Sequence, residues 1–152
     1  MINISPIGYA YNERVEVTDD YWGSIITTIR LTPPLNADSL QEIEAFSHLE
    51  IIYYFHLVQK DKIILGARHP RNNISYPLVG IFAQRAKNRP NKLGSTIVKL
   101  VKIEGSQLFV QGLDCINKTP IIDIKPVMNE FLPKGKVTQP KWSQDIMKKY
   151  WN

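Results

Sequence analysis

The sequence has a single cysteine, Cys115, and no apolar run long enough to cross a membrane as a helix. One thiol excludes an internal disulfide and a cysteine-rich zinc site, and a membrane-spanning helix needs about 20 apolar residues. The first six residues also lack the charged segment and apolar stretch of a secretory signal. We therefore expect a soluble cytoplasmic protein with no membrane partner and a buried, inert Cys115.

Glycine is scarce too, with 8 glycines among 152 residues, while 43% of the residues are hydrophobic. This composition excludes collagen-like and strongly disordered chains. The length fits one domain of ordinary size. No repeat or linker divides the chain, so we expect a single domain over residues 1–152. Its body should occupy about residues 1–127, followed by an extended strap and a helix at about 128–152.

Acidic side chains are few in the second part of the chain. Residues 85–152 contain 13 basic and 5 acidic side chains, whereas residues 1–84 contain 6 basic and 9 acidic ones. Clustered lysine and arginine bind polyanions by releasing counterions from phosphates. The asymmetry thus favours a nucleic-acid partner, and a basic surface that serves only solubility is the alternative.

Most of the regular pattern is that of β-strands. The segment 49–58 is apolar on both alternating faces, which predicts a central strand. Glu104, Gly105 and Ser106 join two strands as a short hairpin connection. The expected strands are 24–31, 49–58, 79–84, 94–103, 107–113 and 121–124. Closing about six or seven strands into a barrel removes exposed edges, so we expect a mainly β fold, a closed or nearly closed barrel with few short helices.

Helix signals are limited to two places. Asp38 is a candidate N-cap with Gln41 three residues later, and residues 142–151 have the pattern of an amphipathic terminal helix. The polar segments 67–77 and 85–92 are expected to be loops. A long loop on a small domain is often functional, and the second of these carries much of the basic charge.

The common cofactor signatures are absent. There is no Gly-x-Gly-x-x-Gly motif after a strand and no Walker A loop, so no Rossmann or P-loop nucleotide site is expected. His48, His56 and His69 lack the spacing of metal ligands. We therefore expect no metal site.

Two segments have patterns that suggest a functional site. In residues 82–94 a strand leads into a basic loop, where the guanidinium groups of Arg85 and Arg89 suit a carboxylate or phosphates. A solvated loop is the alternative. In residues 113–126 Asp114, Asp123 and Lys125 lie among apolar residues, where burial shifts pKa values.

Asp123 and Lys125 are two residues apart in an expected strand, so both side chains should lie on one face. A structural ion pair between them is the alternative to a catalytic role.

Together these two segments resemble the signatures of the TrmO family, also called TsaA-like or YaeB-like proteins. Members carry a loop like Ala-Thr-Arg-Ser-Pro-x-Arg-Pro-Asn-Pro-Ile-Gly and a stretch like Leu-Asp-Leu-x-Asp-Gly-Thr-Pro-Val-x-Asp-Ile-Lys-Pro-Tyr. Pro6-Ile7-Gly8 and Phe46-Ser47-His48-Leu49, which leads into Tyr54-Phe55-His56, match as well. The order and spacing hold from about residue 4 to residue 127.

The resemblance implies an S-adenosylmethionine-dependent methyltransferase built on a β-barrel. Characterised members methylate N6 of threonylcarbamoyladenosine at position 37 of tRNA and form dimers, so it implies tRNA as partner and a homodimer. This chain has Lys118 where the family has glycine and Val127 where it has tyrosine. The N-terminal cofactor segment of the family has no clear counterpart around residues 17–23. A different small-molecule or modified-base acceptor is therefore one alternative, and a non-enzymatic S-adenosylmethionine- or RNA-binding module is another.

The matching positions give candidate site residues. We expect Asp123 to be the general base of methyl transfer, and Lys125 to hold that carboxylate ionised or to neutralise charge on the acceptor. The basic loop is expected to contact RNA phosphates through Lys87, Arg89 and Lys92. The resemblance implies cofactor contacts for His56, Arg85, Ser95, Asn117, Lys118, Thr119 and Pro120.

Overall fold

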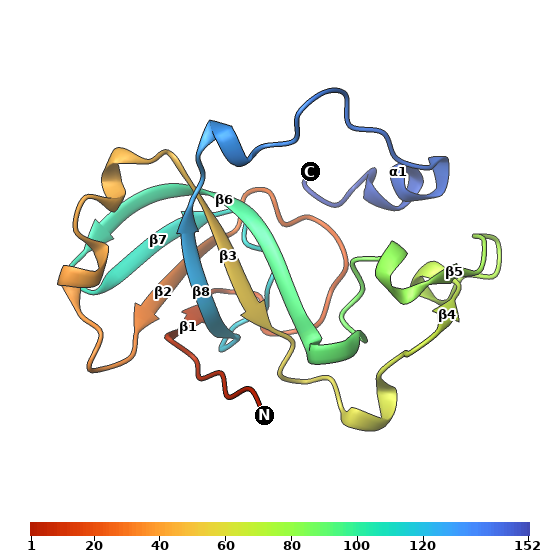
Figure 1. Cartoon of the computed structure of the whole chain (residues 1–152), viewed down its shortest axis with the longest axis horizontal. Helices are drawn as coiled ribbons and strands as arrows, with labels where there is room; N and C mark the ends of the chain where they lie inside the picture. Colours follow the sequence, from red (N-terminus) through yellow and green to blue (C-terminus); the bar gives the residue numbers. More distant parts are fainter.

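The computed structural model describes all 152 residues, and its main feature is a closed antiparallel barrel with strand order β1-β2-β7-β6-β3-β8 (Figure 1). Pairing of β8 with β1 closes it. The mainly β, closed-barrel prediction is confirmed. The strands are β1 (Gly8–Tyr11), β2 (Ile26–Leu31), β3 (His48–Tyr54), β6 (Leu93–Glu104), β7 (Gln107–Gln111) and β8 (Pro120–Pro126).

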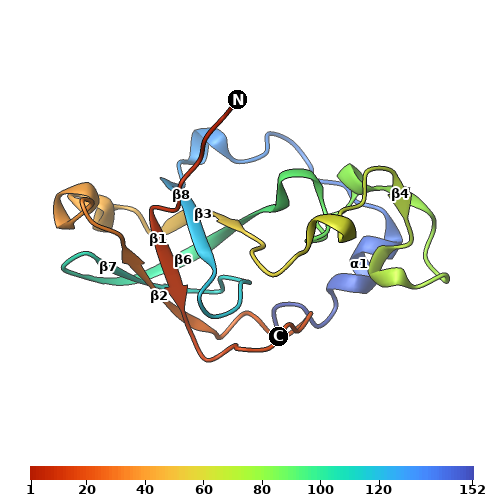
Figure 2. The ribbon, with the colours of Figure 1, turned by 90° about the horizontal axis from the view of Figure 1, so that it is seen from below.

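The remaining elements are short. The strands β4 (Ala67–Arg68) and β5 (Val79–Gly80) form a two-stranded ribbon outside the barrel. Figures 1 and 2 both show the helix α1 (Lys141–Met147) beside this ribbon, at one end of the molecule. No helix is of a length and apolarity that would cross a membrane. Single 3-10 turns complete the fold: η1 (Ala37–Leu40), η2 (Ile43–Ala45), η3 (Lys60–Lys62), η4 (Pro70–Asn72), η5 (Ile81–Ala83), η6 (Pro90–Lys92) and η7 (Asn129–Phe131).

The core fills the inside of the barrel through alternation along each strand. On β3, Leu49, Ile51 and Tyr53 are buried, while the residues between them face outward and are half-buried. Each fully buried aliphatic side chain contributes about 1.5–3 kcal/mol. The strand is central, as predicted, because β6 and β8 pair with its two edges. Its outer face is nevertheless open to solvent, and Ser95 of β6 and Asp123 and Lys125 of β8 lie on the same outer wall of the barrel.

Several expected boundaries differ from the structure. The strand predicted at 79–84 is wrong beyond Gly80, because the side-chain amide of Gln84 donates to the carbonyls of Arg68 and Val79 and folds the chain back. The loop predicted at 67–77 contains β4. The terminal helix ends at Met147 instead of residue 151, and β1 is too short for its pattern to predict it.

The strand β6 leaves one edge of the barrel wall open. Its first half pairs with β3 and its second half with β7, with a register shift between Leu100 and Lys102. The hairpin predicted at residues 104–106 joins β6 to β7, with Gly105 at φ 59°. The edge of β6 that faces away from β3 is therefore free of strand pairing from Leu93 to Val98.

The end of the chain returns to the barrel. The main-chain N–H groups of Tyr21, Trp22 and Gly23 donate to the carbonyls of residues 149–151 at 3.0, 2.8 and 2.9 Å. A Cβ at Gly23 would overlap the Trp151 carbonyl oxygen, so only glycine fits this contact. Residues 128–140, the strap, connect β8 to α1 and include η7.

Candidate functional site

Asp123 and Lys125 lie side by side on the outer face of β8. The Lys125 Nζ is 2.8 Å from Asp123 Oδ2, and the Ile124 N–H donates to Asp123 Oδ1 at 2.9 Å. The hydrogen bond and negative charge of Asp123 raise the pKa of Lys125. The predicted placement of both side chains on one face is confirmed, and the two groups form an ion pair, the structural alternative named in the sequence analysis.

The strand register brings Asp123 and Ser95 onto one wall. Ile52 of β3 pairs with Asp123 on one side and with Ser95 of β6 on the other. Figure 1 shows β3 between β8 and β6. Neighbouring strands are about 4.8 Å apart, so the backbones of Ser95 and Asp123 are about 10 Å apart.

Glu50, which no sequence motif indicated, also lies on this wall. It pairs in register with Lys125, and its Oε1 accepts a hydrogen bond of 2.8 Å from the Ser95 hydroxyl. The wall therefore carries two carboxylates, one ammonium group and one serine hydroxyl. The only local signal for Glu50 was a charged residue at an outward position of an apolar strand.

Arg85 reaches this wall at the open edge of β6. Its Nη2 donates to the main-chain oxygen of Ser95. Main-chain hydrogen bonds join residue 47 to residue 100 and residue 55 to residue 92, at the two ends of the β3–β6 ladder. Bonded pairs alternate in an antiparallel ladder, so the intervening pair 52–95 leaves the Ser95 carbonyl pointing away from β3. Arg85 and Asp123 thus lie on either side of β3 and do not touch.

The basic loop, residues 85–92, is held in place by hydrogen bonds from its own cationic side chains to main-chain carbonyls. Arg89 Nη1 donates to the Gln84 carbonyl at 2.6 Å, and Lys92 Nζ donates to the Val58 carbonyl at 2.7 Å. Lys92 also lies 4.5 Å from the centre of the Tyr54 ring. Lys87 is exposed, and its side chain makes no hydrogen bond or ion pair. Of the three expected RNA contacts, Lys87 alone has a free ammonium group.

The turn before β8 is tied to β1. The N–H of Lys118 donates to the Ala10 carbonyl at 2.7 Å, and Asn117 Oδ1 accepts from the Asn12 N–H at 3.0 Å. Lys118 has φ 69°, a conformation that favours glycine. Thr119 and Pro120 are buried, and the Thr119 hydroxyl donates to the Ile116 carbonyl. Lys118 is the exposed side chain of this turn.

His56 lies just after β3, at the end of the barrel where β6 begins. The last pair of the ladder is Tyr54–Leu93, so His56 is near Lys92. Partial burial lowers the pKa of His56, and the positive charge of Lys92 lowers it further. A hydrogen bond with the main chain of Tyr54 opposes both effects, but the pKa remains lowered. The imidazole is therefore neutral at neutral pH.

A second polar cluster surrounds Asp114, beside the open edge of β6. The Tyr53 hydroxyl donates to Asp114 Oδ1 at 3.0 Å, and the hydroxyls of Thr96 and Tyr150 also donate to this carboxylate. Burial, followed by the charge of Asp114, raises the pKa values of Tyr53 and Tyr150. Cys115 is a buried free thiol, as predicted. The sequence singled out Asp114 but gave no sign of its partners.

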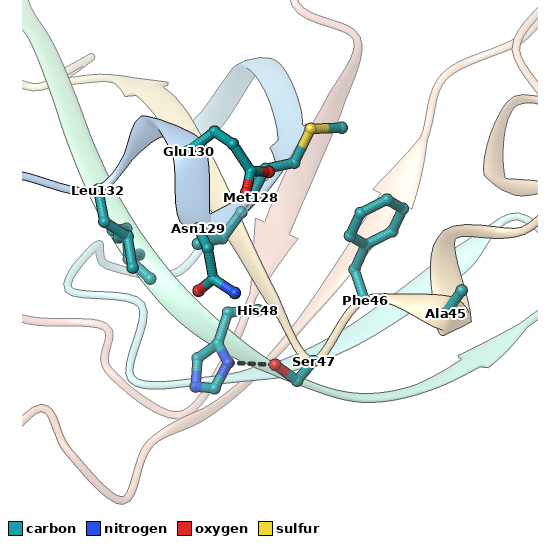
Figure 3. Close-up of a pocket in the computed structure, with 10 residues that line it drawn as sticks. Ala45, Phe46, Ser47, His48, Met128, Asn129, Glu130 and Leu132 are labelled. Atoms are coloured by element: carbon teal, nitrogen blue, oxygen red, sulfur yellow. Dashed lines mark hydrogen bonds between the residues drawn. The ribbon is translucent and has the colours of Figure 1, made fainter.

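A hollow of about 550 Å³ lies elsewhere, where β3 begins and the strap leaves β8 (Figure 3). Ser47 Oγ and His48 Nδ1 are 2.6 Å apart at its floor, and Figure 3 shows the Asn129 side chain pointing toward His48. Val127 also lines it, but none of the predicted catalytic, cofactor or RNA residues does. Nowhere do three or more histidine, cysteine or acidic side chains gather as metal ligands.

The sequence is similar to methyltransferases that act on tRNA. Residues 13–131 match the family model described as the tRNA-methyltransferase O N-terminal domain. A putative S-adenosylmethionine-dependent methyltransferase, RcsF, of Pseudomonas aeruginosa is 37% identical over 130 residues, which are 82% of this chain and 54% of that protein. The human tRNA (adenine(37)-N6)-methyltransferase is 34% identical over 102 residues, 67% of this chain and 23% of that one.

An archaeal relative is covered more fully. A probable S-adenosyl-L-methionine-binding protein of Pyrococcus abyssi is 35% identical over 137 residues, 86% of this chain and 71% of that protein. The chain spans about half the length of the Pseudomonas relative.

The fold matches as well. A crystal structure of TrmO from Pseudomonas aeruginosa superposes with a TM-score of 0.75 and 25% identity, over 93% of this chain and 62% of that one. A second has a TM-score of 0.73 and 27% identity, over 91% and 61%.

Proposed function

The chain belongs to the tRNA-methyltransferase O family, and from this premise we propose that it transfers a methyl group from S-adenosylmethionine to tRNA. The proposed acceptor is N6 of threonylcarbamoyladenosine at position 37. The observation that carries the proposal is the family match over residues 13–131. That range contains the Arg85 loop, which meets the open edge of β6, and the Asp123–Lys125 stretch on β8, which pairs with the other side of β3.

The residues of this wall fit the charges of S-adenosylmethionine. The exposed guanidinium of Arg85 suits the carboxylate of the cofactor, and the Asp123 carboxylate suits a positive charge. His56, neutral by partial burial, is able both to donate and to accept a hydrogen bond. When bound, the cofactor supplies an electrophilic methyl group.

The acceptor nitrogen needs a base. Its lone pair is delocalised into the adenine ring and the carbamoyl carbonyl, and its proton must leave as the new bond forms. In this proposal Asp123 takes that proton at its carboxylate. Lys125, held 2.8 Å away, keeps the carboxylate ionised and neutralises charge on the carbonyl oxygen of the acceptor.

The proposed partner is tRNA, approached from the side of the basic loop. Lys87 meets a phosphate directly, while Arg89 and Lys92 shape the loop through main-chain carbonyls and add positive charge. We further propose a cytoplasmic location and a homodimer.

The decisive test is nucleoside mass spectrometry. Purified protein is incubated with S-adenosylmethionine and tRNA that carries threonylcarbamoyladenosine, and the tRNA is then digested. The expected product is the nucleoside with one added methyl group. Methylation of tRNA from which this modification has been removed would contradict the proposed acceptor.

A different acceptor is favoured by two positions. Lys118 places a long cation on a turn where the family has glycine, and Val127 lines the 550 Å³ hollow. Under this alternative the protein binds S-adenosylmethionine, methylates a small molecule or another modified base, and leaves threonylcarbamoyladenosine unmethylated. A non-enzymatic module would bind the cofactor and methylate no acceptor.

A further inference from the structure

The barrel has a second outer wall, which faces away from the candidate site. It consists of the outer faces of β1, β2, β7 and the second half of β6, and we call it the β2 wall. In the closed strand order, β2 is the third strand from β3 in either direction, so the outer faces of β2 and β3 point to opposite sides. Figures 1 and 2 both show β1, β2 and β7 side by side. None of the expected catalytic, cofactor or RNA residues lies on these three strands.

Aromatic rings lie on the β2 wall at matched positions. Alternation along the strands turns Tyr9 and Tyr11 of β1 and Phe109 of β7 outward. Tyr11 pairs in register with Thr28 of β2, which pairs in turn with Phe109. The backbones of Tyr11 and Phe109 are thus two strand spacings apart, about 10 Å. Two half-buried rings flank a small threonine side chain on the outside of the barrel.

A cation lies over each of these two rings. The guanidinium carbon of Arg30 is 4.3 Å from the centre of the Tyr11 ring. The Lys102 Nζ is 4.6 Å from the centre of the Phe109 ring. Lys102 pairs in register with Phe109, so the row of rings continues onto β6 as a row of positive charge.

The charge of the β2 wall has one sign. Arg30 and Lys99 are exposed and form no ion pair. Glu104 is the single acidic residue of the four strands, and its carboxylate pairs with Lys102 at 2.8 Å. The wall therefore offers free positive charge on both sides of the aromatic row.

Rings and cations interleaved on a sheet face suit unpaired nucleic acid. Its bases stack on aromatic rings and on guanidinium planes, and its phosphates meet the cations. A protein partner is matched less well, because lysine is depleted at protein interfaces. We propose that the β2 wall binds a single-stranded RNA segment, with bases on Tyr11 and Phe109 and phosphates at Arg30 and Lys99. The inference rests on the proposed function for the choice of RNA, and it adds a contact surface away from the site of methyl transfer.

The test compares single-stranded and duplex RNA. Fluorescence anisotropy measures the binding of a labelled oligouridylate of about ten nucleotides and of an RNA duplex of the same length. Tyr11→Leu and Phe109→Leu keep an apolar side chain and remove the ring on which a base stacks. Each should weaken binding of the single strand at least about fivefold and leave the duplex affinity unchanged. Phe131→Leu, an exposed ring on the strap, is the matched control and should change neither affinity.

Arg30→Gln tests the phosphate contact separately. For a single strand, each lost phosphate contact lowers the slope of log affinity against log salt concentration by about 0.7. R30Q should show this reduction for the oligouridylate. An unchanged slope would contradict the contact of Arg30 with the RNA backbone.

The remaining outcomes separate this surface from the proposed function. Unchanged binding of the single strand in both leucine variants, or equal weakening of single strand and duplex, would overturn the RNA-binding role of the β2 wall. No binding of the oligouridylate by a wild type that still methylates tRNA would overturn it too, leave the wall to another partner such as a protein, and leave the proposed function standing. The expected oligouridylate binding without methylation of tRNA would support the wall and overturn the proposed function.

Discussion

At the scale of single residues, the Asp123 side chain lies at the surface and is held in one orientation by two contacts. Its two carboxylate oxygens accept from the Ile124 N–H and from Lys125, so the side chain has a fixed direction on β8. The carboxylate therefore has a fixed position beside the Lys125 ammonium group.

Asp123→Asn tests the proposed general base. The amide keeps the size of the side chain and cannot accept the proton, so we expect turnover to fall at least about 100-fold. Affinity for S-adenosylmethionine should stay within a few-fold. Single-turnover methylation and calorimetry measure the two effects. Asp145→Asn, on α1 far along the chain, is the control, and a normal methylation rate in D123N would rule out the base.

His56 gives the protein a pH dependence. Its folded-state pKa is lowered by burial from an ordinary value of about 6.5, so the unfolded chain binds the proton more readily. The contribution of His56 to stability is therefore complete above the unfolded pKa. It is lost as the pH falls through about 6.5 toward the lowered folded value.

Urea unfolding of the wild type and of His56→Gln at about pH 7.5 and about pH 5 checks this sign. The wild type should lose more stability than H56Q between the two values. An equal acid loss in both proteins would show that the imidazole is not the responsible group.

At the scale of elements, the loop at residues 85–92 shows what a charge count leaves out. Its four cations are equal in sequence, but Arg85, Arg89 and Lys92 donate to main-chain carbonyls, and Lys87 does not. Charge alone therefore overstates how many side chains are free for RNA. Arg85, Arg89 and Lys92 hold the loop conformation, and Lys87 is the residue available for a phosphate contact.

Lys87→Ala should weaken tRNA binding to a similar extent for all tRNA sequences. The slope of log affinity against log salt concentration should fall by about one unit, the value for one lost phosphate contact. Filter binding over a series of salt concentrations gives this slope. Lys136→Ala, on the exposed strap outside the family match, is the control with an unchanged slope. An unaltered slope in K87A would mean that the loop faces away from RNA.

The strands themselves were well predicted where the pattern is local. The hairpin at residues 104–106 and the body of β6 follow from a glycine turn and alternating β-branched residues. The segment 79–84 has the same local pattern, yet Gln84 bonds across to Arg68 and ends the strand. A side-chain contact 16 residues away decides that case.

At the scale of the whole molecule, the last residues of the chain return to contact two distant segments, one near the start of the chain and one after β7. Tyr150 lies beyond the strap and reaches Asp114 after β7, while residues 149–151 bond to residues 21–23. The Asp114 carboxylate thereby joins the chain end to Tyr53 of β3 and Thr96 of β6. Asp114 anchors the chain end beside the edge where Arg85 lies.

Tyr150→Phe removes one hydroxyl from the Asp114 carboxylate. A hydrogen bond to a charged group is worth about 1.5–3 kcal/mol, so we expect a loss of that order in the free energy of unfolding. Chemical denaturation measures it, with Tyr76→Phe as control, because the Tyr76 hydroxyl makes no hydrogen bond. Equal stability of Y150F and the wild type would show that the chain end is not anchored at Asp114.

Features that depend on neighbouring positions along the chain can be predicted from residue patterns. Alternation sets which residues of β3 face the core, the i and i+2 spacing pairs Asp123 with Lys125, and the motif order gives the family resemblance. Which strands lie side by side depends on the folded barrel and has no local signal. Glu50 meets Ser95 across 45 residues and Tyr150 meets Asp114 across 36, and both contacts depend on strand register and chain return. Local patterns predict which way a side chain points, whereas the closed barrel determines which distant residue it contacts.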